Sequence, residues 1–457
     1  MKMRAFCLAG ATALTLVSGA RAADMTMDLK APRAPVYRCD LTGFIELPGT
    51  DICFLVGGHA LFEFYAAEDQ WDVFNTSAAF GIVPDGHTLE DTVGMYAVGR
   101  VNFDARTSTE YGTVRAFVEM EAYDNDTRTG GTFGLRHAFV QFGNWTFGKT
   151  WSTFLYLDAS PIYSDVFIVT GDNFMRRNQI RYTQGFGSGL SFSIAIEDQN
   201  YLTPGGISAA GLFFSPPPPN VVVNDRNELP DVVANIRTEG DWGSAQLSGA
   251  ITNNRYRVVS GAGTAPAPLP GQQTDSDIGW AALAGLVVNA PSLGEDDYFS
   301  LMAMYTDGAF QYNDNIFIGA TNVVWGLCNT LAPAAGGCIL DTVNAWSVLS
   351  SYTHTWSPTW SSTIGAGYAF IDAPLVVANA AAFNLASDFE MQTYEIFGNV
   401  SWTPVPRITF MVDLHYGHVD FNGTGTFAGV FNPLVANPLA KDNQGAFAGA
   451  LEVKYTF

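Results

Sequence analysis

The sequence predicts an all-β protein, a 16-stranded antiparallel transmembrane β-barrel that occupies residues 54–457. Charged residues make up only 14% of the chain, whereas soluble domains usually carry about 25%. Several segments alternate strictly between apolar and polar side chains, which is the pattern of a β-strand with two different faces. Beyond residue 22 no apolar run reaches the roughly 18 residues that a transmembrane helix needs. Strands are therefore the expected means of crossing a membrane.

Composition narrows the possible functions before any motif is considered. The formal net charge of the 457 residues is −22, and such a charge repels the phosphates of nucleic acid. Aromatic residues reach 13%, which supplies ample apolar surface and disfavours disorder. The length allows two or three soluble domains or one very large closed sheet.

The first 22 residues have the pattern of a signal peptide. Lys2 and Arg4 give a positively charged start, and residues 5–17 form a mostly apolar stretch. Ala20 and Ala22 flank Arg21 and fit a small-x-small cleavage site. We therefore expect an exported chain that begins at or near residue 23.

Four cysteines remain after removal of this segment: Cys39, Cys53, Cys328 and Cys338. An even number in an exported protein indicates disulfide bonds. Four cysteines allow three connectivities, of which pairing of sequence neighbours is the simplest. Residues 23–53 are then expected to form a short periplasmic segment that a Cys39–Cys53 bond ties to the first strand.

The clearest strand pattern runs from Arg407 to Tyr416. One face carries Ile408, Phe410, Val412, Leu414 and Tyr416, and the other carries Arg407, Thr409, Met411, Asp413 and His415. A soluble β-sandwich also alternates. However, the polar faces here carry charge, as a water-filled lumen requires, and the apolar faces end in aromatic residues, as in an interfacial girdle. These two features favour a membrane barrel.

Turn signals divide the chain into the 16 expected strands. Their approximate ranges are 54–66, 93–107, 111–123, 132–142, 145–151, 176–184, 189–198, 230–239, 242–257, 277–289, 297–306, 342–355, 359–371, 389–402, 406–419 and 444–457. Short turns alternate with long connections, which is typical of outer-membrane barrels. An even number of strands places both ends of the barrel on the short-turn side, so that the last strand can close against the first.

No catalytic or metal-binding motif stands out, and neither a cofactor nor a metal is expected. His415 and His418 would point to opposite faces of one strand, which disfavours a shared metal. The run Asp124-Asn125-Asp126 could contact calcium through oxygen atoms, but a polar hairpin loop explains it better. His-Glu-x-x-His and Gly-x-Ser-x-Gly motifs are absent from the sequence.

Several motifs resemble those of the alphaproteobacterial porin family. Near the first strand these are Cys39-Asp40-Leu41-Thr42-Gly43-Phe44, Leu47-Pro48-Gly49-Thr50-Asp51-Ile52-Cys53 and Val56-Gly57-Gly58. Further along they are Arg136-His137-Ala138-Phe139-Val140-Gln141-Phe142-Gly143, Thr146-Phe147-Gly148-Lys149 and Arg176-Arg177-Asn178-Gln179-Ile180-Arg181-Tyr182. The terminal Phe457, with Tyr455, is similar to the C-terminal signature of outer-membrane barrels.

This resemblance implies a homotrimer of 16-stranded barrels in which the third long loop folds inward and narrows each pore. Here that constriction loop is about residues 151–175. Its acidic residues are Asp158, Asp165 and Asp172, and the basic wall opposite would comprise Arg100, Arg106, Arg115, Arg177 and Arg181. Facing rings of charge tune ion selectivity in pores. The alternative is that these arginines only solvate the lumen or rim.

The function expected from the barrel is that of a general diffusion porin in the outer membrane of a Gram-negative bacterium. Its partners would be outer-membrane lipid and the small hydrophilic solutes and ions that pass through it, with no nucleic acid. One alternative is a channel selective for a sugar or a carboxylate. Alternatives from other classes are an adhesin or structural barrel that uses its long loops, and an enzymatic barrel or secreted β-hydrolase.

Overall fold

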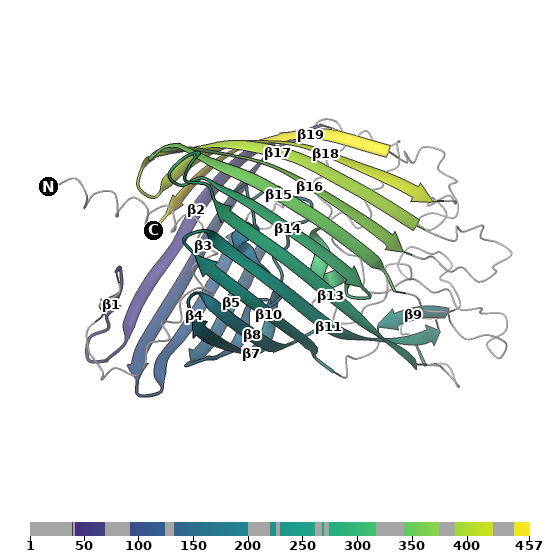
Figure 1. Ribbon diagram of the computed structural model, residues 1–457, viewed down its shortest axis with the longest axis horizontal. Helices are drawn as coiled ribbons and strands as arrows, with labels where there is room; N and C mark the ends of the chain where they lie inside the picture. Colours follow the sequence, from purple (N-terminus) through teal and green to yellow (C-terminus); the bar gives the residue numbers. More distant parts are fainter. Residues whose placement is uncertain are drawn as a thin grey trace.

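The computed structural model shows one large antiparallel sheet that closes on itself (Figure 1). It describes residues 39, 42–68, 92–123, 132–199, 220–224, 229–260, 267–268, 274–316, 342–373, 389–423 and 443–457. The expected signal peptide, Cys328, Cys338 and the run Asp124–Asp126 lie outside these residues.

Sixteen strands form the ring, which confirms the predicted fold class. In chain order they are β2 (Cys53–Ala67), β3 (Thr92–Thr109), β4 (Gly112–Tyr123), β5 (Thr132–Phe142), β6 (Trp145–Trp151), β7 (Arg176–Gly187), β8 (Leu190–Glu197), β10 (Asp231–Gly240), β11 (Gly243–Ser260), β13 (Thr274–Asn289), β14 (Tyr298–Asp307), β15 (Asn344–Ser357), β16 (Trp360–Ala373), β17 (Phe389–Val405), β18 (Ile408–Gly423) and β19 (Asn443–Thr456). Three shorter strands extend the sheet: β1 (Ile45–Glu46), β9 (Asn220–Asn224) and β12 (Ala267–Pro268).

The ring closes between its first and last strands. Strand β19 pairs with β2 over the register Ala448↔Ala67 to Thr456↔His59. The pairing continues to the last residue, since Phe457 and Gly58 exchange two backbone hydrogen bonds of 3.0 and 3.1 Å. A side chain at Gly58 would meet the Arg100 carbonyl at 2.1 Å, so only glycine permits this close approach. Closure satisfies the edge groups that lipid could not hydrogen-bond.

Exposure is inverted relative to a soluble protein. Along β18, Val412 and Leu414 are 52% and 63% exposed, whereas Asp413 between them is fully buried. The last strand repeats this pattern, with Phe447 60% exposed and Glu452 buried. The apolar face therefore points outward and the charged face inward, as the alternation predicted. His415 points inward and His418 outward, where it stacks on Tyr394.

The outward aromatic residues form contacts from strand to strand. Trp346 lies 5.1 Å from Tyr368, and Trp360 lies 5.7 Å from Trp402, measured between ring centroids. Rings of this kind favour the interface between hydrocarbon and water. Among the described residues, no helix is long and apolar enough to span a membrane.

Short turns join the strands at one end of the barrel, where the C-terminus also lies (Figure 1). Several strands run two or three residues further than the sequence predicted. The strand expected to end at residue 107 continues to Thr109, and the one expected to end at residue 402 continues to Val405. Ladder pairing continues through these polar residues because hydrogen bonding to the neighbouring strand does not depend on side-chain polarity.

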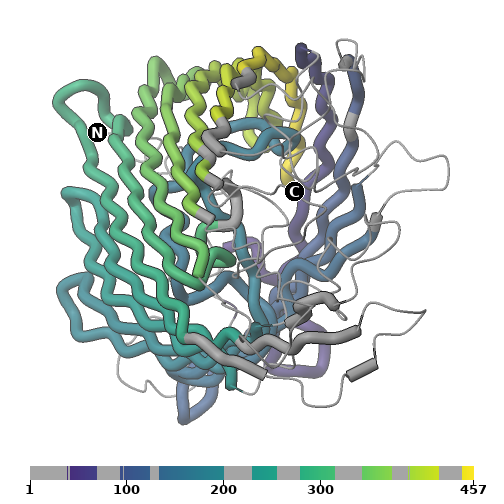
Figure 2. Tube along the Cα trace, turned by 90° about the vertical axis from the view of Figure 1, so that its right-hand side faces the viewer, coloured from purple at the N-terminus to yellow at the C-terminus, as the bar shows by residue number. Residues whose placement is uncertain are grey.

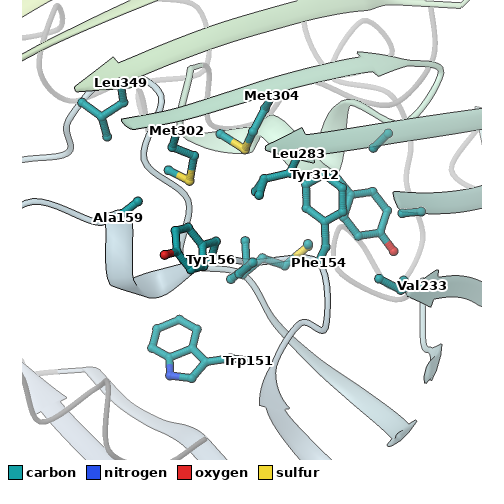
Figure 3. Packing of buried hydrophobic residues seen from close by; sticks show 14 of the residues in the cluster. Trp151, Phe154, Tyr156, Ala159, Val233, Leu283, Met302, Met304, Tyr312 and Leu349 are labelled. Carbon is teal, nitrogen blue, oxygen red and sulfur yellow. The ribbon is translucent and has the colours of Figure 1, made fainter. Parts of the chain in front are cut away.

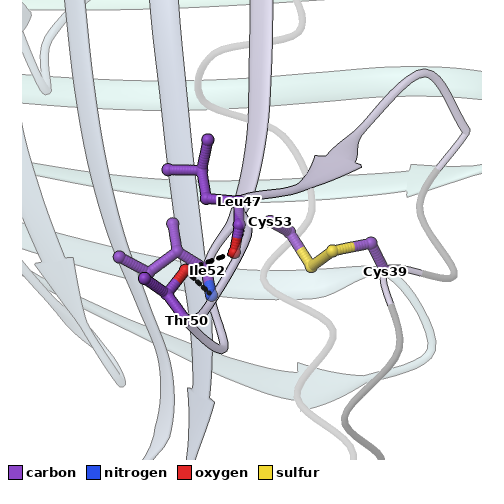
Figure 4. Close-up of a disulfide and its surroundings, with 5 residues drawn as sticks. All are labelled: Cys39, Leu47, Thr50, Ile52 and Cys53. Atoms are coloured by element: carbon purple, nitrogen blue, oxygen red, sulfur yellow. Dashed lines mark hydrogen bonds between the residues drawn. A yellow bond between two sulfur atoms is a disulfide. The ribbon is translucent and has the colours of Figure 1, made fainter.

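The N-terminal segment is tied to the first strand by a disulfide between Cys39 and Cys53 (Figure 4), which confirms that predicted pair. Cys53 is itself the first residue of β2. The sequence predicted no strand before residue 54, but β1 pairs with β2 through Ile45↔Phe54 and Glu46↔Cys53. The Thr50 hydroxyl donates to the Leu47 carbonyl oxygen at 2.9 Å and accepts from the Ile52 N–H at 3.2 Å, which closes the turn.

Candidate functional site: the inner loop and the lumen wall

The chain between β6 and β7, residues 152–175, lies inside the ring of strands (Figure 2). We call this segment the inner loop. Its side chains and backbone contact inward-facing residues of strands that are remote in sequence. It contains one turn of 3₁₀ helix, η3 (Leu157–Ala159). Buried loop backbone needs hydrogen-bond partners, and several of them come from the lumen wall.

Apolar packing holds one side of the inner loop. Phe154, Tyr156 and Val169 are almost completely buried in one apolar cluster. Leu283 and Met302 of the wall belong to the same cluster, and Figure 3 shows them with Phe154 and Tyr156. The wall residues of this cluster come from β10, β11, β13, β14, β15 and β17. Protein interiors of this kind are close-packed and leave little room for water. The lumen is therefore filled with protein on this side.

Polar wall side chains add hydrogen bonds to the same side of the loop. The Gln246 amide donates to the Leu155 carbonyl oxygen at 2.8 Å, and the Asn235 amide donates to that of Thr153 at 2.6 Å. The Tyr156 hydroxyl lies 2.6 Å from the Ser244 hydroxyl. These bonds satisfy loop groups that water does not reach.

A second segment after β14 also enters the lumen. It is η4 (Phe310–Ile316), two short 3₁₀ turns with a break at Asn313. Tyr312 is fully buried, its ring lies 4.9 Å from that of Phe154, and its hydroxyl donates to Asp231 at 2.8 Å. The Asn173 amide donates to the Tyr312 carbonyl oxygen at 2.7 Å. The two segments therefore support each other on the packed side.

Strands β3–β5 carry a different surface of paired charges. Arg100 pairs with Glu121, while Arg136 donates to Glu119 at 2.9 Å and to Glu121 at 2.8 Å. Nearer the short turn between β3 and β4, Arg106 and Arg115 each contact Asp104 at 2.8 Å. Four arginines thus face three carboxylates, which leaves this wall nearly balanced with a small positive excess.

All five arginines named from the sequence lie on inward faces. Arg100, Arg106 and Arg115 belong to the paired wall just described. Arg177 and Arg181 are buried on β7, where Arg177 donates to the Asp198 carbonyl oxygen at 2.8 Å and lies over the Tyr312 ring. Arg177 therefore supports the packed side.

The three loop aspartates have different surroundings. Asp158 pairs with Arg237 at 2.5 Å, an arginine of β10 that the sequence analysis did not single out. Asp172 is buried within the loop and accepts hydrogen bonds from Ser160 and Tyr163. Only Asp165 is exposed, so it is the loop carboxylate that lumen water reaches.

Charges on the wall act on Asp165. Enclosure within the barrel raises the pKa of its carboxyl, but the positive charges of Lys454, Arg100 and Arg136 outweigh this effect and hold the pKa below its usual range. Asp165 therefore lies among basic groups of β19, β3 and β5.

The sequence analysis missed Arg136, Arg237 and the inward carboxylates Asp104, Glu119 and Glu121 as members of the site. The sequence did contain a signal for these residues. Each lies at a position of its strand that faces inward in the alternation, or beside a β-bulge such as the one near Glu119. Within the described part of the chain, no group of three or more His, Cys, Asp or Glu residues is arranged to hold a metal ion.

Comparison with known proteins places this geometry in context. A family model described as "Porin subfamily" matches residues 30–446. The chain is 25% identical to Porin Omp2a of Brucella canis over 269 residues, 55% of this chain and 66% of that protein. It is 27% identical to Porin Omp2b of Brucella melitensis over 261 residues, 53% of this chain and 64% of that protein. The match thus spans slightly less than two thirds of these relatives.

Two solved structures share the fold at low sequence identity. One is the outer membrane channel DcaP of Acinetobacter baumannii, with a TM-score of 0.60, 18% identity, and coverage of 89% of this chain and 97% of that one. The other is an anion-selective porin from Comamonas acidovorans, with a TM-score of 0.50, 11% identity, and coverage of 89% and 100%.

Proposed function

Because this chain belongs to the porin subfamily and folds as an outer-membrane β-barrel, we propose that it forms a water-filled channel for passive diffusion of small hydrophilic solutes and ions. The observation that carries this proposal is the inverted distribution of side chains. Apolar residues cover the outside, whereas paired charges line the inside of β3–β5. A ring of sixteen strands is wide enough for an aqueous channel.

In this proposal the pore narrows between the inner loop and the β3–β5 wall. The loop is packed against the opposite wall, so water would pass on the charged side. Asp165 would face Arg100 and Arg136 there. Because the wall charges are mostly paired, size would limit passage more than charge would. Facing charges would still orient polar solutes.

Single-channel recording of the refolded mature protein in a planar bilayer tests the proposal. We expect large, steady openings, and a salt gradient would give the sign of the ion preference. Absence of conductance from protein shown to be folded by its heat-modifiable mobility on gels would overturn the channel function. Competition between a sugar or carboxylate and the ion current would instead support a substrate-selective channel.

We further propose that three copies associate through the outward face of β3 and β4. This face presents small and aliphatic side chains, including Met95, Ala97, Gly99 and Ala116, all of them exposed. The outward face of β14–β18 instead carries the aromatic contacts that suit lipid. A surface of small residues lets two membrane proteins approach closely.

The trimer proposal has a direct test. Gly99→Trp should prevent association, since the indole would separate the two walls. Leu301→Trp, on the lipid-facing side of β14, should leave association unchanged and serves as the control. Cross-linking and conductance in threefold steps report the result. Equal trimer yields for both variants would exclude β3 and β4 as the interface.

A further inference from the structure

Four buried carboxylates of the lumen wall lie directly against the backbone of the inner loop. Glu63, Glu197, Glu395 and Asp413 belong to β2, β8, β17 and β18, and each is at most 3% exposed. Each accepts a hydrogen bond from a main-chain N–H of the loop.

Three of these bonds hold the far half of the loop. The Ser164 N–H donates to Asp413 Oδ2 at 2.7 Å, and the Asp165 N–H donates to Glu63 Oε1 at 2.6 Å. The Thr170 N–H donates to Glu395 Oε2 at 2.8 Å. Hydrogen bonds of this length to carboxyl oxygens are among the stronger ones in proteins.

The fourth bond holds the beginning of the loop. The Thr153 N–H donates to Glu197 Oε1 at 2.6 Å, and the Ser152 hydroxyl donates to Glu197 Oε2 at 2.7 Å. The loop is therefore attached at both its beginning and its far half to strands on different parts of the ring. Main-chain bonds do not depend on which side chains the loop carries.

A buried histidine joins two of these carboxylates. His415 Nδ1 lies 2.5 Å from Glu395 Oε1, and its Nε2 lies 3.0 Å from Asp413 Oδ2. The Phe167 ring of the loop covers this imidazole, with 4.3 Å between ring centroids. Glu395, His415 and Asp413 thus form one connected group beneath the loop.

We infer that these four carboxylates are positioning residues, which fix the inner loop from the wall and thereby set the width of the pore. The inference rests on the proposed channel function. The loop contains only one turn of 3₁₀ helix and has little regular structure of its own. Its shape therefore depends on its attachments. Loss of one of these acceptors leaves a buried N–H without its hydrogen bond, which raises the population of a displaced loop by about tenfold or more.

The test compares alanine with the amide at the same position. Asp413→Ala and Glu63→Ala remove the acceptor, whereas Asp413→Asn keeps an oxygen that can accept the Ser164 N–H. Glu110→Gln, in the exposed turn between β3 and β4, removes a carboxylate outside the lumen site, and it controls for the change in charge. Heat-modifiable gel mobility identifies the folded variants, and Glu197→Ala replaces any alanine variant that does not fold.

Three measurements are made on every variant. Hydrogen exchange of peptides from residues 152–175 reports loop attachment without requiring conduction. Single-channel noise and the size limit for sugars in liposome swelling report pore width. We expect the alanine variants to exchange about tenfold faster or more, to show more noise and to admit larger sugars. Asp413→Asn and Glu110→Gln should resemble the wild type in exchange and size limit.

The outcomes separate the two proposals. Unchanged exchange in folded alanine variants would overturn the attachment. Faster exchange with an unchanged size limit would overturn its control of pore width. A wild-type protein that is folded but does not conduct would contradict the channel function, while the exchange data would still decide whether the carboxylates hold the loop.

Discussion

The two sides of the inner loop differ in what they meet. Toward β10–β15 the loop buries Phe154, Tyr156 and Val169 in a close-packed apolar cluster. Toward β3–β5 the lumen presents arginines and carboxylates that pair with one another, as Arg136 does with Glu119. The same closed sheet thus provides an apolar packing surface on one side and a surface of paired charges on the other.

This difference shows how one barrel could hold its inner loop firmly and still leave room for the proposed channel. Apolar contacts remove water and hold the loop, so they close the lumen where they form. Paired charges retain partners without the loop and remain favourable in contact with water. The position of the proposed channel would therefore be set by the wall on which the apolar residues of the inner loop pack.

Removing the packing should have the largest effect. Phe154→Ala deletes a fully buried ring, and such changes usually cost about 3–5 kcal/mol. We expect the loop to detach from β10–β15, with higher conductance and more noise in single-channel records. Phe447→Ala on the lipid-facing surface is the control. If Phe154→Ala conducts as the wild type does, the apolar cluster does not position the loop.

Neutralising the charged side should change selectivity and leave pore width unaltered. Arg136→Gln removes one positive charge near Asp165. A unit charge about 4 Å from a passing ion is worth about 1 kcal/mol in water, so the permeability ratio should move toward cations by about fivefold or less. Reversal potential in a salt gradient measures this. Arg177→Gln, on the packed side, should increase noise instead. Equal shifts in reversal potential for both variants would mean that the charged side and the packed side do not differ in their effect on ion selectivity.

Acid should produce a smaller change through Asp165. Its pKa is held below the usual range of about 4. The attraction between its negative charge and the wall is therefore complete at neutral pH and is lost only as the pH falls through this lowered value. The permeability ratio should move toward anions there, and Asp165→Asn should lack that part of the change. A wild-type pH profile identical to that of Asp165→Asn would show that Asp165 does not act on the ion path.

The disulfide lies outside this comparison and should affect the pore least. Replacing Cys39 and Cys53 with serine opens a link with a sequence separation of 14. A closed loop of about this length contributes about 3 kcal/mol in the chain-entropy model. We expect easier proteolysis of the segment before β2 with unchanged conductance. Altered conductance would mean that this segment reaches the ion path.

The strands could be predicted from sequence because their signal is local. Alternation along Ile408, Val412 and Leu414 assigns faces without knowledge of the neighbouring strand. The predicted strand ends were less exact, since ladder pairing continues through residues such as Ser108 that favour turns in isolation. Strand β1 was missed because two residues are too few to show alternation.

The site was predictable only in part. Inward parity indicated Arg100, Arg115 and Arg181 as lumen residues, and in the structure all three lie on the inward faces of their strands. It did not show that Asp158 would pair with Arg237, because 79 positions separate these residues in the chain. The aromatic content of residues 152–175 was a visible signal for packing, but it did not identify the wall that the loop would meet.

The sequence by itself determined that the chain would be a closed barrel with apolar residues outside and charged residues inside. That information lies in periodicity, which each strand carries alone. Only the tertiary structure decided which wall the inner loop packs against and which carboxylates accept its backbone N–H groups. Those contacts join residues as far apart as Ser164 and Asp413, which become neighbours only when the sheet closes.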